Sequence, residues 1–212
     1  MKLEKHVKRI VECPRCKTRT IYDHLQYFNS QEDIKEIAEL MSGRFSFIQC
    51  NHCGALIEDT GLLYEDPAKN VIIFYDDEVN FQTRFFITPF QFDKYYTVTN
   101  FQEFFNCVFS INHNLNWWTV KLCIASMLCN FFERCKEKNF KKLDLERCIL
   151  FEKDGSIQLY TSLAYEDYAI AQILTIDLYK KVQEKYMKKA TEIIMDFYYL
   201  SDKNAFNIVC EG

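Results

Sequence analysis

Two pairs of closely spaced cysteines constrain this chain more than any other feature. The first pair lies in Cys13-Pro14-Arg15-Cys16, and the second lies in Cys50-Asn51-His52-Cys53, which Gly54 follows. Zinc binds four thiolates tetrahedrally, and each C-x-x-C turn supplies two of them from one short loop. The spacing therefore predicts a Zn²⁺ site whose ligands are Cys13, Cys16, Cys50 and Cys53.

The residues inside and beside these turns favour a structural metal site. A redox dithiol or a chance spacing is the alternative, but Pro14 stiffens the first turn and Gly54 permits a left-handed backbone after the second. Four thiolates leave no open position for water or substrate, which indicates an architectural role. His52 is a candidate substitute ligand; a solvent-facing position in the turn is the simpler interpretation, so we leave it out of the set.

The chemical state of the remaining cysteines depends on the compartment. The first ten residues carry five charges and no apolar signal segment, and the longest apolar run, 122–132, is too short to span a bilayer. We expect a soluble, cytoplasmic protein without membrane contact, in which thiols stay reduced. The six other cysteines are then interpreted as packing thiols, among them Cys107, Cys123, Cys129 and Cys135.

The segment between the cysteine pairs has its own pattern. Apolar residues at Ile34, Ile37, Ala38 and Met41 follow helical spacing, with Ser30 as the expected N-cap. Strand-like stretches cover residues 6–12, 18–28 and 45–49. The sequence thus predicts a zinc ribbon with a short inserted helix.

These pieces resemble the CpXC domain of bacterial proteins. The resemblance is carried by Cys13-Pro14-Arg15-Cys16, by Met41-Ser42-Gly43-Arg44-Phe45, by Cys50 to Gly54 and by Gly61-Leu62-Leu63-Tyr64-Glu65-Asp66. It covers roughly the first eighty residues and thins beyond them. The resemblance implies a zinc site on the four cysteines, and it implies no particular biochemical activity.

The rest of the chain predicts an α+β fold. Strands are expected at 71–75, 83–87 and 95–99. A helix is expected to start at the overlapping cap signals of 99–103, and a second helix, capped by Asn116, is expected over 117–138. Asp154-Gly155 between two apolar runs predicts a β-hairpin. A long helix over 166–199 and a final strand over 205–210 complete the pattern.

The expected architecture is an N-terminal zinc ribbon with an inserted helix, an antiparallel sheet, and a mostly helical C-terminal part with one β-hairpin. We place a ribbon and sheet module at residues 1–89 and a helical α+β body at 90–212, packed together as one unit.

Catalysis has no support in the motifs. The five glycines are too dispersed for a nucleotide-binding loop or a nucleophile elbow. None of the four histidines stands in a recognisable catalytic arrangement, so the sequence predicts a non-enzyme. His113, in an expected inter-helix loop, is the first histidine to inspect, and a backbone-bonded structural role is the simpler interpretation.

Nucleic-acid binding is one function the charge pattern suggests. The chain has a net charge of -4, but residues 1–20 carry a local excess of basic residues. An acidic stretch over 57–80 can neutralise that excess, and the lysines of 180–189 form a second basic stretch. The candidate nucleic-acid or partner contacts are Lys8, Arg9, Arg15, Lys17 and Arg19.

Protein interaction is the favoured hypothesis. The chain holds 19 Phe, 13 Tyr and 2 Trp, more aromatic residues than one core obviously requires. Tyr95-Tyr96 and Tyr198-Tyr199 are adjacent pairs, and on a strand or helix both members of a pair cannot point inward at once. We therefore expect exposed aromatics that suit an interface. The partner is an unidentified protein. An inhibitor of a nucleic-acid-handling machine from a mobile element, for example of a CRISPR nuclease, is a further alternative.

Overall fold

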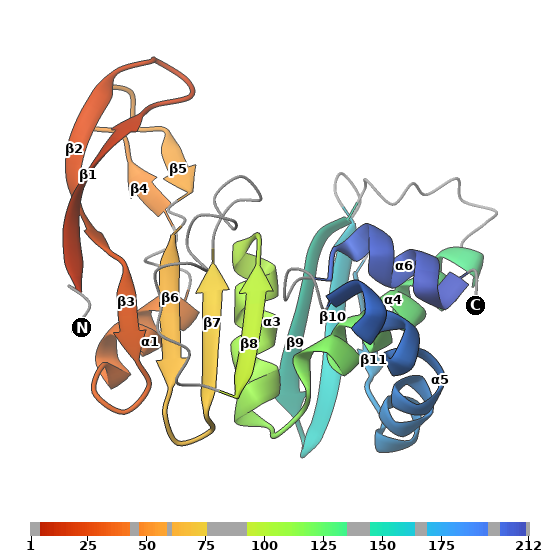
Figure 1. Ribbon diagram of the computed structural model, residues 1–212. Helices are drawn as coiled ribbons and strands as arrows, with labels where there is room; N and C mark the ends of the chain where they lie inside the picture. Colours follow the sequence, from red (N-terminus) through yellow and green to blue (C-terminus); the bar gives the residue numbers. More distant parts are fainter. Residues whose placement is uncertain are drawn as a thin grey trace. The chain divides into compact units, whose positions relative to one another are not determined.

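The computed structural model describes residues 5–42, 47–58, 61–75, 93–134, 145–163, 169–194 and 200–210 (Figure 1). The chain divides into two compact units, Met1–Phe104 and Phe105–Gly212. This division lies fifteen residues beyond the expected boundary after residue 89, because the strand that precedes it pairs with the first unit's sheet. The mixed α+β class is confirmed.

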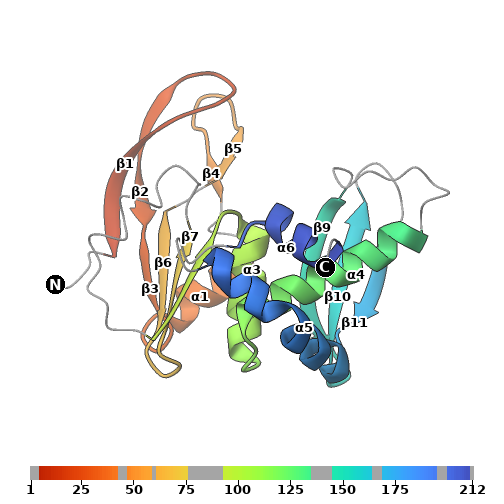
Figure 2. The same cartoon turned by 45° about the vertical axis from the view of Figure 1, so that its right-hand side comes forward.

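Two small antiparallel hairpins make the ribbon. Strands β1 (His6–Glu12) and β2 (Arg19–Leu25) form one, and β4 (Phe47–Gln49) and β5 (Leu56–Glu58) form the other. Along β1 the side chains alternate strictly between exposed and half-buried, as expected for a ribbon with one covered face. The two hairpins extend past the end of the main sheet of their unit (Figures 1 and 2).

The insertion between the hairpins holds β3 (Tyr27–Asn29) and α1 (Ile34–Met41). The expected helix is confirmed, but its N-cap is Asp33 rather than Ser30: the Asp33 carbonyl accepts the first helical hydrogen bond, from the N–H of Ile37. The Asp33 carboxylate also accepts the N–H of Asn29 at 2.8 Å and pairs with Lys5. This buried carboxylate therefore joins the start of β1 to the helix.

The stability of the first unit should depend on pH through this carboxylate. Burial opposes ionisation, but the hydrogen bonds from Lys5 and Asn29 outweigh it and lower the pKa of Asp33. A lowered pKa stabilises the fold above the unfolded value of about 3.9, and that contribution disappears as the pH falls through the folded pKa. We expect Asp33→Asn to lower the unfolding free energy at pH 7, with the difference shrinking towards pH 3. A pH-independent difference in denaturant titrations would contradict this account.

The main sheet of the first unit has the order β3-β6-β7-β8, with β6 (Leu62–Asp66), β7 (Val71–Tyr75) and β8 (Lys94–Val98). Among its described strands, β6 and β7 pair antiparallel, whereas β3–β6 and β7–β8 are parallel. The sheet is therefore mixed rather than antiparallel. Between β3 and β6, and again between β7 and β8, the chain returns to the end of the sheet where the previous strand began, so the next strand runs in the same direction. The expected strand over 83–87 lies outside the described residues.

Both faces of this sheet are covered. Every residue of β7 is buried, and Tyr64 and Tyr75 contact Phe104 on one face while Ile72, Phe74 and Tyr95 form a cluster on the other. The expectation of an exposed Tyr95 or Tyr96 was wrong, because each side chain enters a different covered face. Tyr198 and Tyr199 lie outside the described residues.

Helices α3 (Phe101–Asn112) and α4 (Trp117–Arg134) begin at the expected caps. Asn100 accepts the N–H of Glu103, whose carboxylate accepts the N–H of Thr99, and Asn116 accepts the N–H of Thr119. The first three turns of α4 are buried on nearly every side, which confirms a central helix. Among the described residues, no helix is long and apolar enough to cross a membrane.

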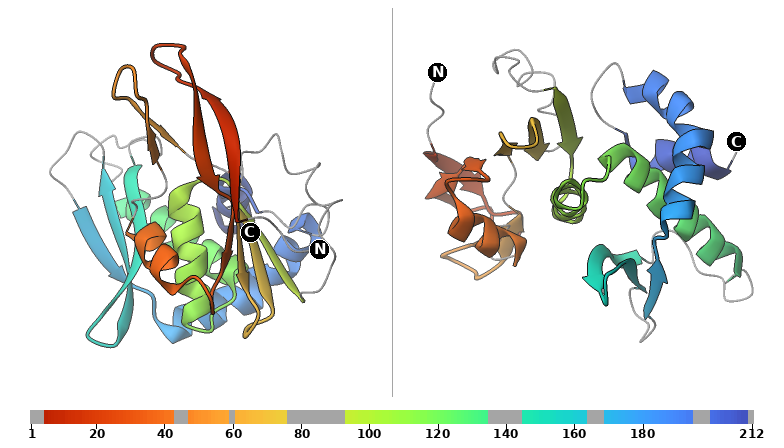
Figure 3. Two further views of the ribbon diagram at one scale, coloured as in Figure 1. Left: turned by 90° about the vertical axis from the view of Figure 1, so that its left-hand side faces the viewer. Right: turned by 90° about the horizontal axis from the view of Figure 1, so that it is seen from below.

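The second unit also has a sheet, of order β11-β10-β9. The expected hairpin is confirmed: β9 (Leu145–Lys153) and β10 (Ser156–Leu163) meet at Asp154 and Gly155, both with positive φ. We expected one long helix over 166–199, and the first part of that prediction was wrong. Strand β11 (Ala169–Ile173) pairs with β10 there, and helix α5 (Ile176–Ile194) begins only after it. The last element is helix α6 (Asp202–Cys210), not a strand. Helices α4, α5 and α6 pack together on one side of the sheet (Figure 3).

Two of the cysteines that we expected to be reduced packing thiols are oxidised, so that expectation was wrong for them. Cys129 of α4 and Cys210 of α6 form a disulfide, which closes a loop of 81 residues. Because these two cysteines lie 81 positions apart in different helices, no local pattern in the sequence predicts their pairing. Cys107 and Cys123 are buried and take part in no disulfide, as expected, and burial raises the pKa of Cys123 to about 12. Cys135 lies outside the described residues.

Candidate metal centre

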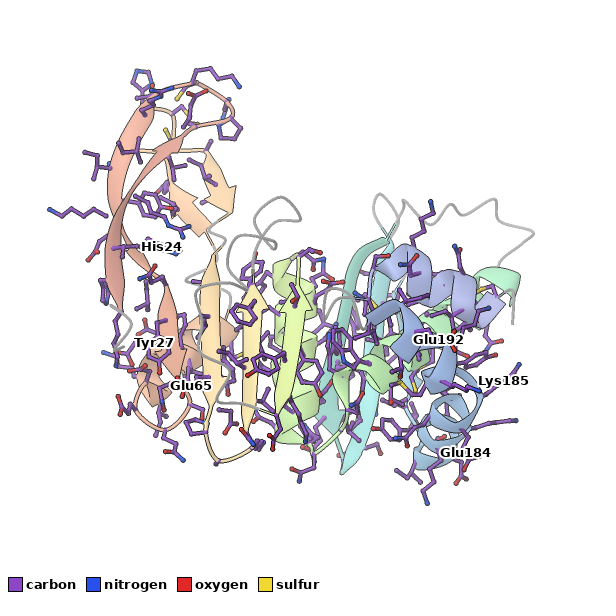
Figure 4. All side chains as sticks on the ribbon, in the orientation of Figure 1. His24, Tyr27, Glu65, Glu184, Lys185 and Glu192 are labelled. Carbon is purple, nitrogen blue, oxygen red and sulfur yellow. A yellow bond between two sulfur atoms is a disulfide. The ribbon has the colours of Figure 1, made fainter. Side chains whose placement is uncertain are left out.

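The four predicted cysteines meet at the tips of the two hairpins. The sulfur atoms of Cys13, Cys16, Cys50 and Cys53 all lie within 4.8 Å of one another. Cys13 and Cys50 are buried, whereas Cys16 and Cys53 are half-buried. Sulfur sticks are visible beside the turn between β1 and β2 (Figure 4). Residues separated by more than thirty positions thus form one cluster that can hold a metal ion.

The two turns share one backbone design. In the first, the N–H of Lys17 donates to the carbonyl of Cys13 at 2.8 Å; in the second, the N–H of Gly54 donates to that of Cys50 at 2.9 Å. Lys17 and Gly54 both have positive φ, 59° and 70°. The glycine marked this conformation in the second turn. Lys17 adopts the same positive φ although it is not a glycine. The sequence indicates this conformation only through its position, four residues after Cys13, which matches that of Gly54 after Cys50.

The distances within the cluster fit a tetrahedral metal. Cys13 and Cys53 sulfurs lie 3.6 Å apart, as do those of Cys16 and Cys50. A zinc ion at about 2.3 Å from each of four sulfurs would require sulfur–sulfur separations of about 3.8 Å. The thiols therefore need to move only slightly to bind one ion. Each turn supplies one buried and one half-buried sulfur to the set.

The electrostatics of the cluster favour a bound cation. The hydroxyl and then the N–H of Thr18 lower the pKa of Cys16 to about 6, and the N–H of Cys16 lowers the pKa of Cys13. The N–H of Ala55 lowers the pKa of Cys53, but desolvation and the neighbouring sulfurs outweigh it and raise that pKa to about 12. Hydrogen-bond donors thus favour the thiolate at Cys13 and Cys16, while desolvation and the neighbouring sulfurs disfavour it at Cys53, and a cation between the sulfurs would offset that repulsion. No motif in the sequence marks Thr18 for this role.

The candidate basic contacts do not form one face. Lys8 and Arg19 lie on the exposed side of the β1–β2 hairpin, and Arg9 lies on the opposite side. Arg19 pairs with Glu12 at 3.2 Å. Arg15 and Lys17 are exposed in the first turn, and His52 is exposed in the second, outside the cysteine cluster.

Histidines elsewhere are held by structural contacts. The ring nitrogens of His113 lie 2.9 Å from the Phe109 carbonyl and 3.1 Å from Glu152, and the ring stacks on Phe109. His24 is fully buried, 3.4 Å from the Gly61 carbonyl, and Figure 4 shows it between the ribbon and the main sheet of its unit. The backbone-bonded interpretation of His113 is thus confirmed.

Comparison with known proteins gives one match. A family model described as "CpXC protein" matches residues 11–125, which is more than half of the chain and includes all four cysteines of the cluster. No curated protein matches the chain. No solved structure matches it either.

Proposed function

The chain belongs to the CpXC family, and from this membership together with its four-thiol cluster we propose a non-catalytic interaction module held together by one structural zinc ion. The observation that carries this proposal is the closed ligand set: four thiols, from two turns of the same design, lie within 4.8 Å of one another. Four protein ligands complete a tetrahedral zinc site, and such sites support folds rather than reactions.

Zinc would supply what the two hairpins lack. The β4–β5 hairpin has only three residues in each strand, and an isolated two-stranded hairpin is marginally stable in water. A metal that joins the tips of both hairpins fixes each relative to the other, and its binding free energy becomes folding free energy. The outer surface of the ribbon is then rigid enough to serve as a binding surface.

A non-catalytic role is also consistent with the histidines. Both ring nitrogens of His113 already have partners, and His24 is buried against a backbone carbonyl. The proposal therefore assigns the chain no reaction.

Nucleic-acid binding draws less support from the arrangement. Lys8 lies opposite Asp23 across the strands, Arg19 pairs with Glu12, and Arg9 faces the other side. On α5 one acid, Glu184, stands among the five lysines of 180–189 and lies four residues before Lys188. Arg15 and Lys17 remain as exposed cations beside the cluster. An inhibitor of a nucleic-acid-handling machine would be one form of the interaction role rather than a separate mechanism.

Affinity capture from the native host tests the interaction role directly. The full chain is used as bait with and without nuclease treatment, and Cys50→Ser serves as the bait whose ribbon is disrupted. We expect a protein partner that survives nuclease treatment and is lost with the variant. Capture that depends entirely on nucleic acid, and weakens steeply with salt, would favour the nucleic-acid alternative and contradict the proposal.

A further inference from the structure

The outer face of the β1–β2 hairpin carries an apolar pair in a position where a ribbon usually presents polar residues. Ile10 and Ile21 are direct cross-strand partners, and their side chains are 69% and 66% exposed. Single exposed isoleucines are common, but these two adjoin one another and form one continuous spot. The other face of the hairpin is covered, so this spot lies on the side away from the core of its unit.

Charged pairs border the spot at both ends. Lys8 lies opposite Asp23 in the row before the isoleucines, and Glu12 lies opposite Arg19 in the row after them. All four charged residues are exposed, and His6 approaches Asp23 at 3.3 Å. The signs alternate along each strand as well as across the strands. This outer face, defined by Lys8, Ile10, Glu12, Arg19, Ile21 and Asp23, is neutral as a whole and does not suit a polyanion.

The alternating signs make this outer face complementary to itself. If a second copy faces it with the two-fold axis along the strands, Lys8 meets the second copy's Asp23 and Glu12 meets its Arg19. If the axis runs across the strands, Lys8 instead meets Glu12 and Asp23 meets Arg19. In both arrangements every positive charge faces a negative one and the isoleucines bury one another. Such self-complementarity is the requirement for an isologous contact.

We propose that the outer face of the β1–β2 hairpin is a self-association surface whose partner is a second copy of this chain. The inference rests on the proposed interaction role and names one partner for it. The apolar spot is small, and interfaces below about 1,200 Å² are usually transient. The dimer is therefore in equilibrium with the monomer. Zinc bound at the end of the same hairpin would fix the conformation of the two strands that form this outer face.

Sedimentation of the zinc-loaded chain of 212 residues over a range of concentrations tests this surface. We expect a reversible monomer–dimer equilibrium for the wild type. Ile10→Lys with Ile21→Lys, and separately Ile10→Glu with Ile21→Glu, should each raise the dissociation constant at least about tenfold. The matched control is Ile34→Lys, since Ile34 of α1 is 71% exposed and lies outside this face; it should leave the equilibrium unchanged.

Mixing the lysine and glutamate variants separates a specific contact from a general loss of folding. Under either two-fold axis the lysines of one copy meet the glutamates of the other, so the mixture should associate more tightly than either variant alone. Unchanged zinc content shows that the variants keep the ribbon. A wild type that stays monomeric at the highest soluble concentration, or a mixture that fails to associate, would overturn the self-association surface. Neither result would affect the zinc site or capture of a different protein.

Discussion

Replacing Cys50 by Ser is expected to release the metal and unfold the ribbon. Cys50 is a buried member of the cluster, and its sulfur lies 3.6 Å from that of Cys16. Structural zinc contributes roughly 10–16 kcal/mol of apparent binding free energy in zinc-finger peptides, so losing one of four thiolates removes several kcal/mol from the ribbon. The second unit, Phe105–Gly212, contains none of the four ligands and should keep its helices.

Amide hydrogen exchange with metal analysis measures this effect. Protection should disappear in β1, β2, β4 and β5 while it persists in α4, and zinc should fall well below one ion per chain. Cys148→Ser is the matched control, because Cys148 is a half-buried thiol outside the cluster. His52→Ala should also retain the metal. A Cys50→Ser chain with full zinc content and an intact ribbon would refute the ligand assignment.

Replacing Asn106 by Ala should destabilise the second unit by about 2–4 kcal/mol. Among the described strands, β9 lies at the edge of its sheet, and the Asn106 amide bonds to backbone groups along that edge. Its Nδ2 donates to the Cys148 carbonyl at 2.9 Å and its Oδ1 accepts the N–H of Leu150 at 2.8 Å. Asn106 is itself buried, so truncation leaves two backbone groups without partners away from water.

Denaturant unfolding followed by far-UV circular dichroism gives this free energy. Asn130→Ala is the control, since Asn130 is an exposed asparagine of α4, and its change should stay within about 0.5 kcal/mol. Protection from hydrogen exchange should fall first in β9. A loss of stability no larger than that of Asn130→Ala would show that the Asn106 amide does not hold the edge of the sheet.

Local signals in the sequence predicted much of the fold and the whole cysteine cluster. The Asp154-Gly155 hairpin, the caps at Asn100 and Asn116, and β1 depend on residues close together in the chain. The cluster was predictable for a similar reason. Each turn encodes its own geometry within five residues, and tetrahedral coordination requires the two turns to meet.

Features that depend on distant partners were not predictable. Strand β11 exists because β10 offers it an edge, although its own sequence suits a continuing helix. The segment 205–210 is apolar enough for a strand, yet Ala205, Phe206 and Ile208 become a helical face that packs beside α4. The burial of both Tyr95 and Tyr96 required knowing that the sheet is covered on both faces. Intrinsic propensity determines whether such a segment forms a helix or a strand only where tertiary packing favours neither.

The zinc content of the freshly purified chain of 212 residues tests the account most directly. Elemental analysis should find one zinc ion per chain, and X-ray absorption at the zinc edge should show four sulfur ligands at about 2.3 Å. Removing that ion with a chelator should melt the ribbon and make four additional thiols reactive. A chain that is folded without metal, or one that holds iron in the same thiols, would contradict the structural zinc site.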